Sequence, residues 1–353
     1  MLTDKIEKLL TKSAKKSKTL QFAMSLPAMS IDYSFSSTTP VQKFHSASVG
    51  KLITAVLTFK AIEQGSIALN TPLHRVLEQG VLDRLFMYEG QDYQREVTVE
   101  HLLSHTSGVN DYFESTTFDG ASFIDEVIKR SDTIWMPMDL LDYTRTKQRG
   151  VGTPGQQFYY SDTGYVLLGL VLESIYGMPI GLALQKHLFE PAGMTDTCLC
   201  FHSEAFDPKQ LAPMYINGTD IHLFPSLSCD FSGGGLSTTT ADLLRFLRQL
   251  QNGQLISSGS LTKMAQFTHR YRQGMVYGVG MMQLRFEQFF FLLKHLPRLQ
   301  GHLGVTGAHA WYDPVSGASY VLNVGNTKDM AGSFKLLIKI LQLVHREQRE
   351  RRT

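Results

Sequence analysis

Apolar residues recur at helical spacing at both ends of the chain. The first segment predicts a helix with one apolar face and a lysine-rich opposite face, and the apolar side is formed by Leu2, Ile6, Leu9 and Leu10. Residues 333–352 predict a long amphipathic helix whose apolar side is formed by Phe334, Leu337, Ile338, Leu341 and Val344. The tail HREQRERRT is typical of a frayed, solvated helix end rather than a binding patch.

Between these ends, the pattern changes from strands to helices and back. Residues 20–37 predict two short strands, and residues 277–326 are rich in strand patterns, above all at 277–281 and 319–324. We expect helices at 48–64, 99–104, 122–130 and 164–176, within a mostly helical middle that reaches about residue 200.

This order predicts one sheet built from both chain ends, with a helical lobe inserted between them. The fold class is α/β of the α+β type, as a single domain over residues 1–353. We place the α/β lobe at approximately 1–60 and 225–353, and the helical lobe at approximately 61–224. A cleft where two lobes meet is a usual place for a small-molecule site.

Composition narrows the function classes. Of the 353 residues, 43% are hydrophobic and 19% are charged, which is ordinary for a globular protein. The net charge of +2 is too small to argue for nucleic acid as a partner, and no run of eighteen apolar residues predicts a membrane span. The first helix is basic, so contact with a membrane surface is an alternative, but its short apolar face favours packing on the core.

Two further features bear on the compartment. The N-terminus lacks the uninterrupted apolar stretch and cleavage site of a secretory signal, so we expect a cytoplasmic protein. Cys198, Cys200 and Cys229 are odd in number, and the first two are too close together for a good disulfide or a standard zinc knuckle. We expect all three to be reduced, structural thiols.

Ser-x-x-Lys occurs three times in the chain, at Ser13, Ser48 and Ser260. The first and last are expected on solvated helix surfaces, whereas Ser48 begins an apolar helix. Residues i and i+3 share a helix face, so Lys51 can reach Ser48 and serve as its activating base, with a pKa lowered by burial. The first helical turn also offers free N–H groups to an oxyanion. The alternative is a polar helix start with a solvated lysine.

A second candidate segment is TPGQQFYYSDTGYVLLGLVLE at 153–173. Ser161 or Asp162 can simply cap the following helix, and Tyr160 can simply be a half-buried packing residue. In a catalytic reading, a tyrosine beside a lysine has a lowered pKa and moves protons for a serine.

A third segment is GHLGVTGAHAWYDP at 301–314. His302 is expected on a strand, and Gly304 lets a ligand approach the backbone closely. The N–H of Val305 is a candidate second oxyanion donor. On chemistry alone, His309 is as plausible as His302.

One more histidine pair has the spacing of metal ligands. His101 and His105 lie four residues apart on an expected helix, but the Glu of a metalloprotease helix is missing between them. We therefore interpret this stretch as structural and expect no metal.

Together these segments resemble the serine β-lactamase-related family, in the branch of class C β-lactamases, D-alanyl-D-alanine carboxypeptidases and family VIII esterases. The resemblance runs from about Lys43 to Asn326. It rests on FHSASVGKLITAV at 44–56, VTVEHLLSHTSGV at 97–109, the segment at 153–173, HLFEPAGM at 187–194, GGLSTTTADLLRF at 234–246 and the segment at 301–314.

The resemblance implies a β-lactamase/transpeptidase-like fold and a role for each matching residue. Ser48 is the acylated nucleophile, Lys51 its activating partner and Tyr160 the general base and acid, while His302 is the basic residue of the strand motif. The N–H groups of Ser48 and Val305 form the oxyanion hole, and Asp162, Leu303 and Gly304 contact substrate. No metal or organic cofactor is implied.

Two positions depart from the family pattern. The second motif usually ends in Asn, and here it ends in Asp162, which accepts hydrogen bonds but donates none and can pair with Lys51 and keep it charged. The third motif commonly has Thr where this chain has Leu303, which removes a hydroxyl that helps to hold a substrate carboxylate, and His302 is mostly neutral at pH 7. Both changes favour uncharged substrates.

The predicted function is a serine hydrolase that forms an acyl-enzyme on a carboxylic ester or small amide. The first alternative is a β-lactamase or D-Ala-D-Ala carboxypeptidase. The second is a β-lactam or peptidoglycan sensor without turnover, or a scaffold. The expected partner is a small ester, amide or peptide substrate, with no nucleic acid and no stable membrane insertion. The sequence leaves the natural substrate and the oligomeric state open.

Overall fold

The two ends of the chain meet in one large antiparallel sheet. The computed structural model describes residues 1–17 and 19–351. The strand order is β10-β11-β12-β13-β14-β15-β1-β2, so β1 lies between β2 and the last strand in the sequence. The strands are β1 (Gln21–Leu26), β2 (Ile31–Ser36), β10 (His269–Arg272), β11 (Met275–Tyr277), β12 (Met282–Leu284), β13 (Leu299–Gly304), β14 (Ala308–Tyr312) and β15 (Ser319–Asn323). The α+β fold with an antiparallel sheet from both chain ends is confirmed.

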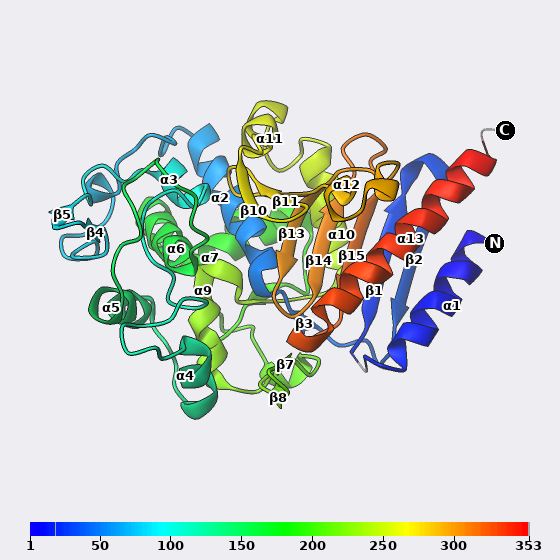
Figure 1. The fold of residues 1–353 in the computed structure, drawn as a ribbon, viewed down its shortest axis with the longest axis horizontal. Helices are drawn as coiled ribbons and strands as arrows, with labels where there is room; N and C mark the ends of the chain where they lie inside the picture. The colour runs from blue at the N-terminus through cyan, green and yellow to red at the C-terminus, as the bar shows by residue number, and fades with distance from the viewer. Residues whose placement is uncertain (18, 352–353) are drawn as a thin grey trace.

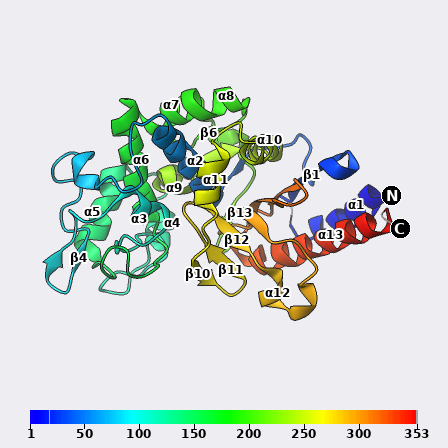
Figure 2. The ribbon, with the colours of Figure 1, turned by 90° about the horizontal axis from the view of Figure 1, so that it is seen from above.

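The N- and C-terminal helices cover one face of this sheet. α1 (Leu2–Ala14) lies along α13 (Met330–Glu350) in both views (Figures 1 and 2). Leu2, Ile6 and Leu10 are buried, so the apolar face of the first helix packs on the core as predicted. The final helix begins three residues earlier than predicted, and the predicted end at Arg352 lies outside the described residues.

The opposite face of the sheet carries the helices that build the site. α10 (Thr240–Gln251) packs on β1, β14 and β15. α2 (Gly50–Glu63) follows a 3-10 turn at Ala47–Val49 and packs against α6 (Asp162–Tyr176) and the short α9 (Phe231–Gly234). Almost every side chain of α2 is buried, as expected for a helix whose sequence is apolar on all sides.

The remaining helices are short and lie mostly in the middle of the chain. They are α3 (Val99–Leu103), α4 (Phe123–Lys129), α5 (Pro137–Lys147), α7 (Ile180–Leu184), α8 (Glu190–Ala192), α11 (Ser258–Met264) and α12 (Phe286–Phe289). Three small sheets pair β3 (Phe44–His45) with β9 (Leu236–Thr238) and β6 (Cys198–Leu199), β4 (Met87–Tyr88) with β5 (Gln91–Asp92), and β7 (Tyr215–Ile216) with β8 (Thr219–Asp220). β3 leads directly into the Ala47–Val49 turn.

One predicted strand is wrong. Tyr277 ends β11, but residues 278–281 form a turn between β11 and β12, because Gly280 adopts a φ of +82° that side-chain-bearing residues avoid. A Cβ on Gly280 would come within 2.4 Å of the Ala55 Cβ, so this glycine also lets the turn reach α2.

Two other sequence features are resolved by the structure. Cys198, Cys200 and Cys229 are free and buried. Within residues 1–17 and 19–351, no single helix is long and apolar enough to span a membrane, and one pair bent by 72°, Asp162–Tyr176 with Ile180–Ala192, meets that test by length and composition only.

Candidate active site

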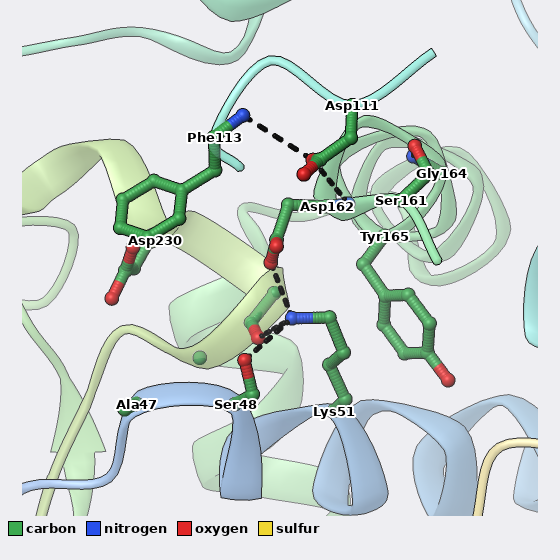
Figure 3. Close-up of polar contacts among 12 residues, drawn as sticks. Ala47, Ser48, Lys51, Asp111, Phe113, Ser161, Asp162, Gly164, Tyr165 and Asp230 are labelled. Carbon is green, nitrogen blue, oxygen red and sulfur yellow. Dashed lines mark hydrogen bonds and ion pairs between the residues drawn. The ribbon is translucent and has the colours of Figure 1, made fainter. Parts of the chain in front are cut away.

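Ser48 and Lys51 lie together at the start of α2. Ser48 is half-buried in the 3-10 turn, and the Lys51 side chain is fully buried one turn later. The Lys51 ammonium donates hydrogen bonds to Ser48 Oγ at 3.0 Å and to the carbonyl oxygen of Gly233 at 2.7 Å, and it forms an ion pair with Asp162 (Figure 3). The two residues are therefore in direct contact, and Lys51 is not the solvated lysine of the alternative reading.

Three glycines allow this close assembly. A Cβ on Gly233 would lie 2.9 Å from Asp162 Oδ1, and one on Gly234 would lie 2.5 Å from the Ala47 carbonyl oxygen. A Cβ on Gly304 would lie 2.8 Å from the Ala47 Cβ. Any side chain at these positions would push α9 or β13 away from the Ser48 turn.

Asp162 is fixed at the N-terminus of α6. Ser161 is the N-cap, and its hydroxyl accepts the Gly164 N–H at 3.2 Å while donating to the Asn110 carbonyl at 2.8 Å. Asp162 is the first residue of the helix, where the positive end of the helix dipole favours a negative side chain. The sequence left Ser161 and Asp162 as alternative caps, and the structure assigns that role to Ser161.

Two further carboxyl groups lie near the Lys51–Asp162 pair: Asp111 is buried, and Asp230 is partly buried. Asp111 accepts the backbone N–H of Asp162 at 2.9 Å, and burial together with the negative charge of Asp162 raises its pKa to about 8. Burial and the charge of Asp162 also raise the pKa of Asp230 to about 7, an effect that the Lys51 charge opposes. The site therefore has more acidic groups than its single buried lysine can neutralise.

Tyr160 lies beside Ser48, but its acidity differs from the prediction. Its ring centroid lies 5.1 Å from Lys51 Nζ, and the Ser48 side chain is near enough to its hydroxyl to act against the rise in its pKa. Burial and the negative charge of Asp162 raise the pKa of Tyr160 well above its usual value. The expected lowering of this pKa is therefore wrong, because burial and the nearby Asp162 act in the opposite direction. Tyr160 is a neutral phenol at physiological pH.

His302 lies behind the site and is fully buried. Its Nε2 is within 3.1 Å of the Tyr277 hydroxyl, and burial lowers its pKa to about 3, so it is neutral at pH 7. In the antiparallel register, Leu303 is opposite His309, which places these two residues on the same face of the sheet. His309 there contacts Ser333 and Trp311 beneath α13. The register thus separates the two histidines, and His302 is the one on the Ser48 side.

His105 contacts the tyrosine segment. α3 ends at Leu103, and His105 has a φ of +57°, so the expectation that His101 and His105 share a helix is wrong. Its Nδ1 accepts the Ser161 N–H at 3.0 Å, and its ring lies 4.3 Å from that of Tyr160. Within the described residues, no group of three or more His, Cys, Asp or Glu side chains is arranged to hold a metal ion.

A narrow pocket opens beside Ser48. Its apolar walls come from α4, from the β7–β8 hairpin and from the loops next to them, and comprise Phe113, Ile124, Val127, Ile128, Met214, Ile216, Ile221 and Leu227. Its polar lining includes Glu114, Asp162, Asp230 and His45, and no Arg or Lys of the described chain is among the lining residues.

The predicted oxyanion donors meet at this pocket. Ser48 and Val305 both line it, and the close contact between Gly304 and Ala47 keeps them together. Leu303 packs with the apolar cluster under α1 and α13, and neither Leu303 nor Gly304 lines the pocket. Their contact with substrate stays a prediction.

Sequence reasoning missed Gly233, Asp111, Asp230 and His105 as parts of the site. Gly233 directly precedes the segment at 234–246 that matched the family pattern, but nothing in the sequence indicates that its carbonyl group faces Lys51. Asp230 lies three residues before Gly233, and an acidic residue next to a matched segment was the one available signal.

Comparison with known proteins agrees with this geometry. The sequence profile of the Beta-lactamase family matches residues 34–338. The chain belongs to that family. A curated relative, the putative D-alanyl-D-alanine carboxypeptidase of Escherichia coli strain K12, is 28% identical over 200 residues, which cover 48% of this chain and 45% of the relative. The chain spans about half the length of the curated relatives it matches.

Solved structures of other proteins share the whole fold. The D-amino acid amidase of Ochrobactrum anthropi SV3, complexed with L-phenylalanine amide, has a TM-score of 0.80 and 22% identity, and the match covers 98% of this chain and 99% of the amidase. EstCE1, described as a hydrolase with promiscuous acyltransferase activity, has a TM-score of 0.77 and 19% identity over 98% of both chains. The β-lactamase/transpeptidase-like fold is thus confirmed.

Proposed function

We propose that this chain is a serine hydrolase that forms an acyl-enzyme at Ser48 and acts on a carboxylic ester or a small amide. The observation that carries the proposal is the 3.0 Å contact between Ser48 Oγ and the buried Lys51, at a pocket that Val305 also lines. This combination supplies a nucleophile, a proton-transfer partner and a place for an oxyanion. Packing alone does not require it, which argues against a scaffold.

The pocket supports uncharged or positively charged acyl groups over carboxylates. Its walls are apolar and its charged lining residues are acids, so a substrate carboxylate would meet repulsion there. Arg272 lies near this rim but is held by Glu114 at 3.3 Å. A β-lactamase or D-Ala-D-Ala carboxypeptidase needs a group that binds a carboxylate, so these activities are the less favoured alternatives. The amidase and hydrolase names of the structural neighbours support the same choice.

The test is steady-state hydrolysis of short p-nitrophenyl esters by the wild type and by Ser48→Ala. Each neutral acyl ester is paired with one of equal length that ends in a carboxylate. We expect many turnovers for the wild type, background rates for the variant, and at least about a tenfold preference for the neutral ester, which corresponds to 1.4 kcal/mol. Equal rates for wild type and variant would refute the function, and a single turnover would favour the sensor.

A further inference from the structure

The contacts around Ser48 do not by themselves show which group accepts its hydroxyl proton. Ser48 must lose its hydroxyl proton in order to attack, and three groups contact it or its lysine: Lys51, Tyr160 and Asp162. Tyr160 is a neutral phenol, which has no strongly basic lone pair. Lys51 donates to three acceptors at once, namely Ser48 Oγ, Asp162 and the Gly233 carbonyl, and this uses all three protons of an ammonium.

His302 does not supply the missing base. Its Nε2 is occupied by the Tyr277 hydroxyl, and its Nδ1 lies 3.0 Å from the backbone of Leu303. Within the described residues, the carboxyl group that pairs with Lys51 is that of Asp162, at the position where the family pattern usually has an amide.

We propose that Asp162 is the proton acceptor of this site and receives the Ser48 hydroxyl proton by way of Lys51. This inference rests on the proposed function and deepens it. In relatives with Asn at this position, the amide can hold the lysine but cannot take its proton. In this chain the lysine and the carboxylate act as one unit.

The proton steps balance without any added reactant. The Lys51 ammonium transfers one proton to Asp162, and the N–H electron pair stays on nitrogen. Rotation about the Cε–Nζ bond turns this lone pair toward Ser48. As Ser48 Oγ bonds to the substrate carbonyl carbon, its O–H proton passes to Lys51 and the carbonyl π pair moves onto oxygen. When the carbonyl re-forms, the leaving group departs with its bonding pair and takes that proton from Lys51. Attack of water in deacylation uses the same unit, and Asp162 returns its proton to Lys51 at the end.

Asp162 acts through another residue, so the informative readout is pH dependence. Other ionisable groups lie around the Lys51–Asp162 pair, and their charges influence its proton affinity. They are Asp111, Tyr112, Glu114, Tyr160, Tyr165, Cys229, Asp230, Tyr271, Tyr277, His105 and His302. The acid limb of kcat/KM therefore belongs to the Lys51–Asp162 pair as a whole.

The deciding variant is Asp162→Asn, which keeps the shape and an acceptor for Lys51 but removes the carboxylate. The acceptor is then the Lys51 amine alone, and amines lose their proton at higher pH than carboxylic acids. We expect the acid limb of ester hydrolysis to move up by at least about one pH unit, with at least about a tenfold loss on that limb and a much smaller loss at high pH. Asp162→Glu should keep the wild-type limb, because a carboxylate remains.

Asp230→Asn is compared only for the position of its acid limb, because Asp230 lines the pocket; it removes a nearby, partly buried carboxylate that forms no hydrogen bond or ion pair with Lys51 among the described residues. Its acid limb should stay or move to lower pH, because one repelling charge is gone. An equal loss at every pH in Asp162→Asn, or a gain at every pH, would overturn the inference. So would an upward shift of the limb in Asp162→Glu, which stays informative if Asp162→Asn fails to fold. Absence of Ser48-dependent turnover in the wild type would instead refute the proposed function.

Discussion

Gly304 lies so close to Ala47 that a Cβ on the glycine would come within 2.8 Å of the alanine Cβ. This contact joins β13 to the turn that carries Ser48 and thereby sets the distance between Ser48 and Val305. The proposed oxyanion hole uses one backbone donor from each of these residues, and such a hole tolerates little displacement of either donor.

The first prediction follows from that contact. Gly304→Ala should move Val305 away from Ser48 and lower kcat by about 10²–10³-fold, as expected for the loss of one oxyanion donor. The melting curve should show that the variant is still folded at the assay temperature, so that unfolding does not account for the loss of kcat. Gly332→Ala is the control, because a Cβ there meets nothing within 4 Å. Steady-state ester hydrolysis measures both variants, and comparable losses in both would contradict the role of this contact.

The second prediction concerns the Lys51–Asp162 ion pair. Lys51→Met leaves the buried Asp162 without its cation, so it should lower the free energy of unfolding by roughly 3–5 kcal/mol. Adding Asp162→Leu removes the unpaired charge and should recover much of that loss. Urea unfolding measures both proteins. A double variant that is no more stable than Lys51→Met would show that the charge of Asp162 is not the source of the loss.

The third prediction concerns pH and stability. Burial raises the pKa of Asp230 from 3.8 to about 7, so the folded protein holds a proton that the unfolded chain releases between these values. The stability from that proton is complete below the unfolded pKa and is lost as the pH rises through 7. Asp230→Asn should therefore gain roughly 2–3 kcal/mol relative to the wild type between pH 5 and pH 8.

Urea unfolding of both proteins at the two pH values tests this, and the difference between them cancels all other titrating groups. Asp132→Asn, at an exposed carboxylate, should show the same difference from wild type at both pH values. A gain for Asp230→Asn that does not depend on pH would exclude a buried, protonated Asp230.

Local patterns in the sequence predicted much of the fold. The apolar faces of α1 and α13 and the apolar run of α2 identify these helices because each follows a helical period. The turn at residues 278–281 was not predicted, because its conformation depends on a φ of +82° at Gly280 and on contact with Ala55, more than 200 residues away. The choice between His302 and His309 also needed the strand register, which the sequence does not state.

Contacts of the site between residues close in the sequence were predicted, and contacts between residues far apart in the sequence were missed. Ser48 and Lys51 are three residues apart, so their contact follows from helix geometry. The Gly233 carbonyl lies 182 residues from Lys51 in the sequence, and every residue has a carbonyl group, so residue identity does not show which one contacts Lys51. The acidity of Tyr160 was misjudged for a related reason: the motif showed a nearby lysine, whereas the burial that raises the pKa of Tyr160 depends on the packing of distant segments.

The most direct test of the central claim is to find the acyl group on Ser48. The wild type and Ser48→Ala are mixed with a short p-nitrophenyl ester, quenched in acid within the first turnover, and digested for peptide mass spectrometry. The account predicts one added acyl mass on the peptide that contains Ser48 in the wild type, no adduct in the variant, and loss of the adduct as the wild type turns over. An adduct on another residue, or turnover by Ser48→Ala at the wild-type rate, would contradict it.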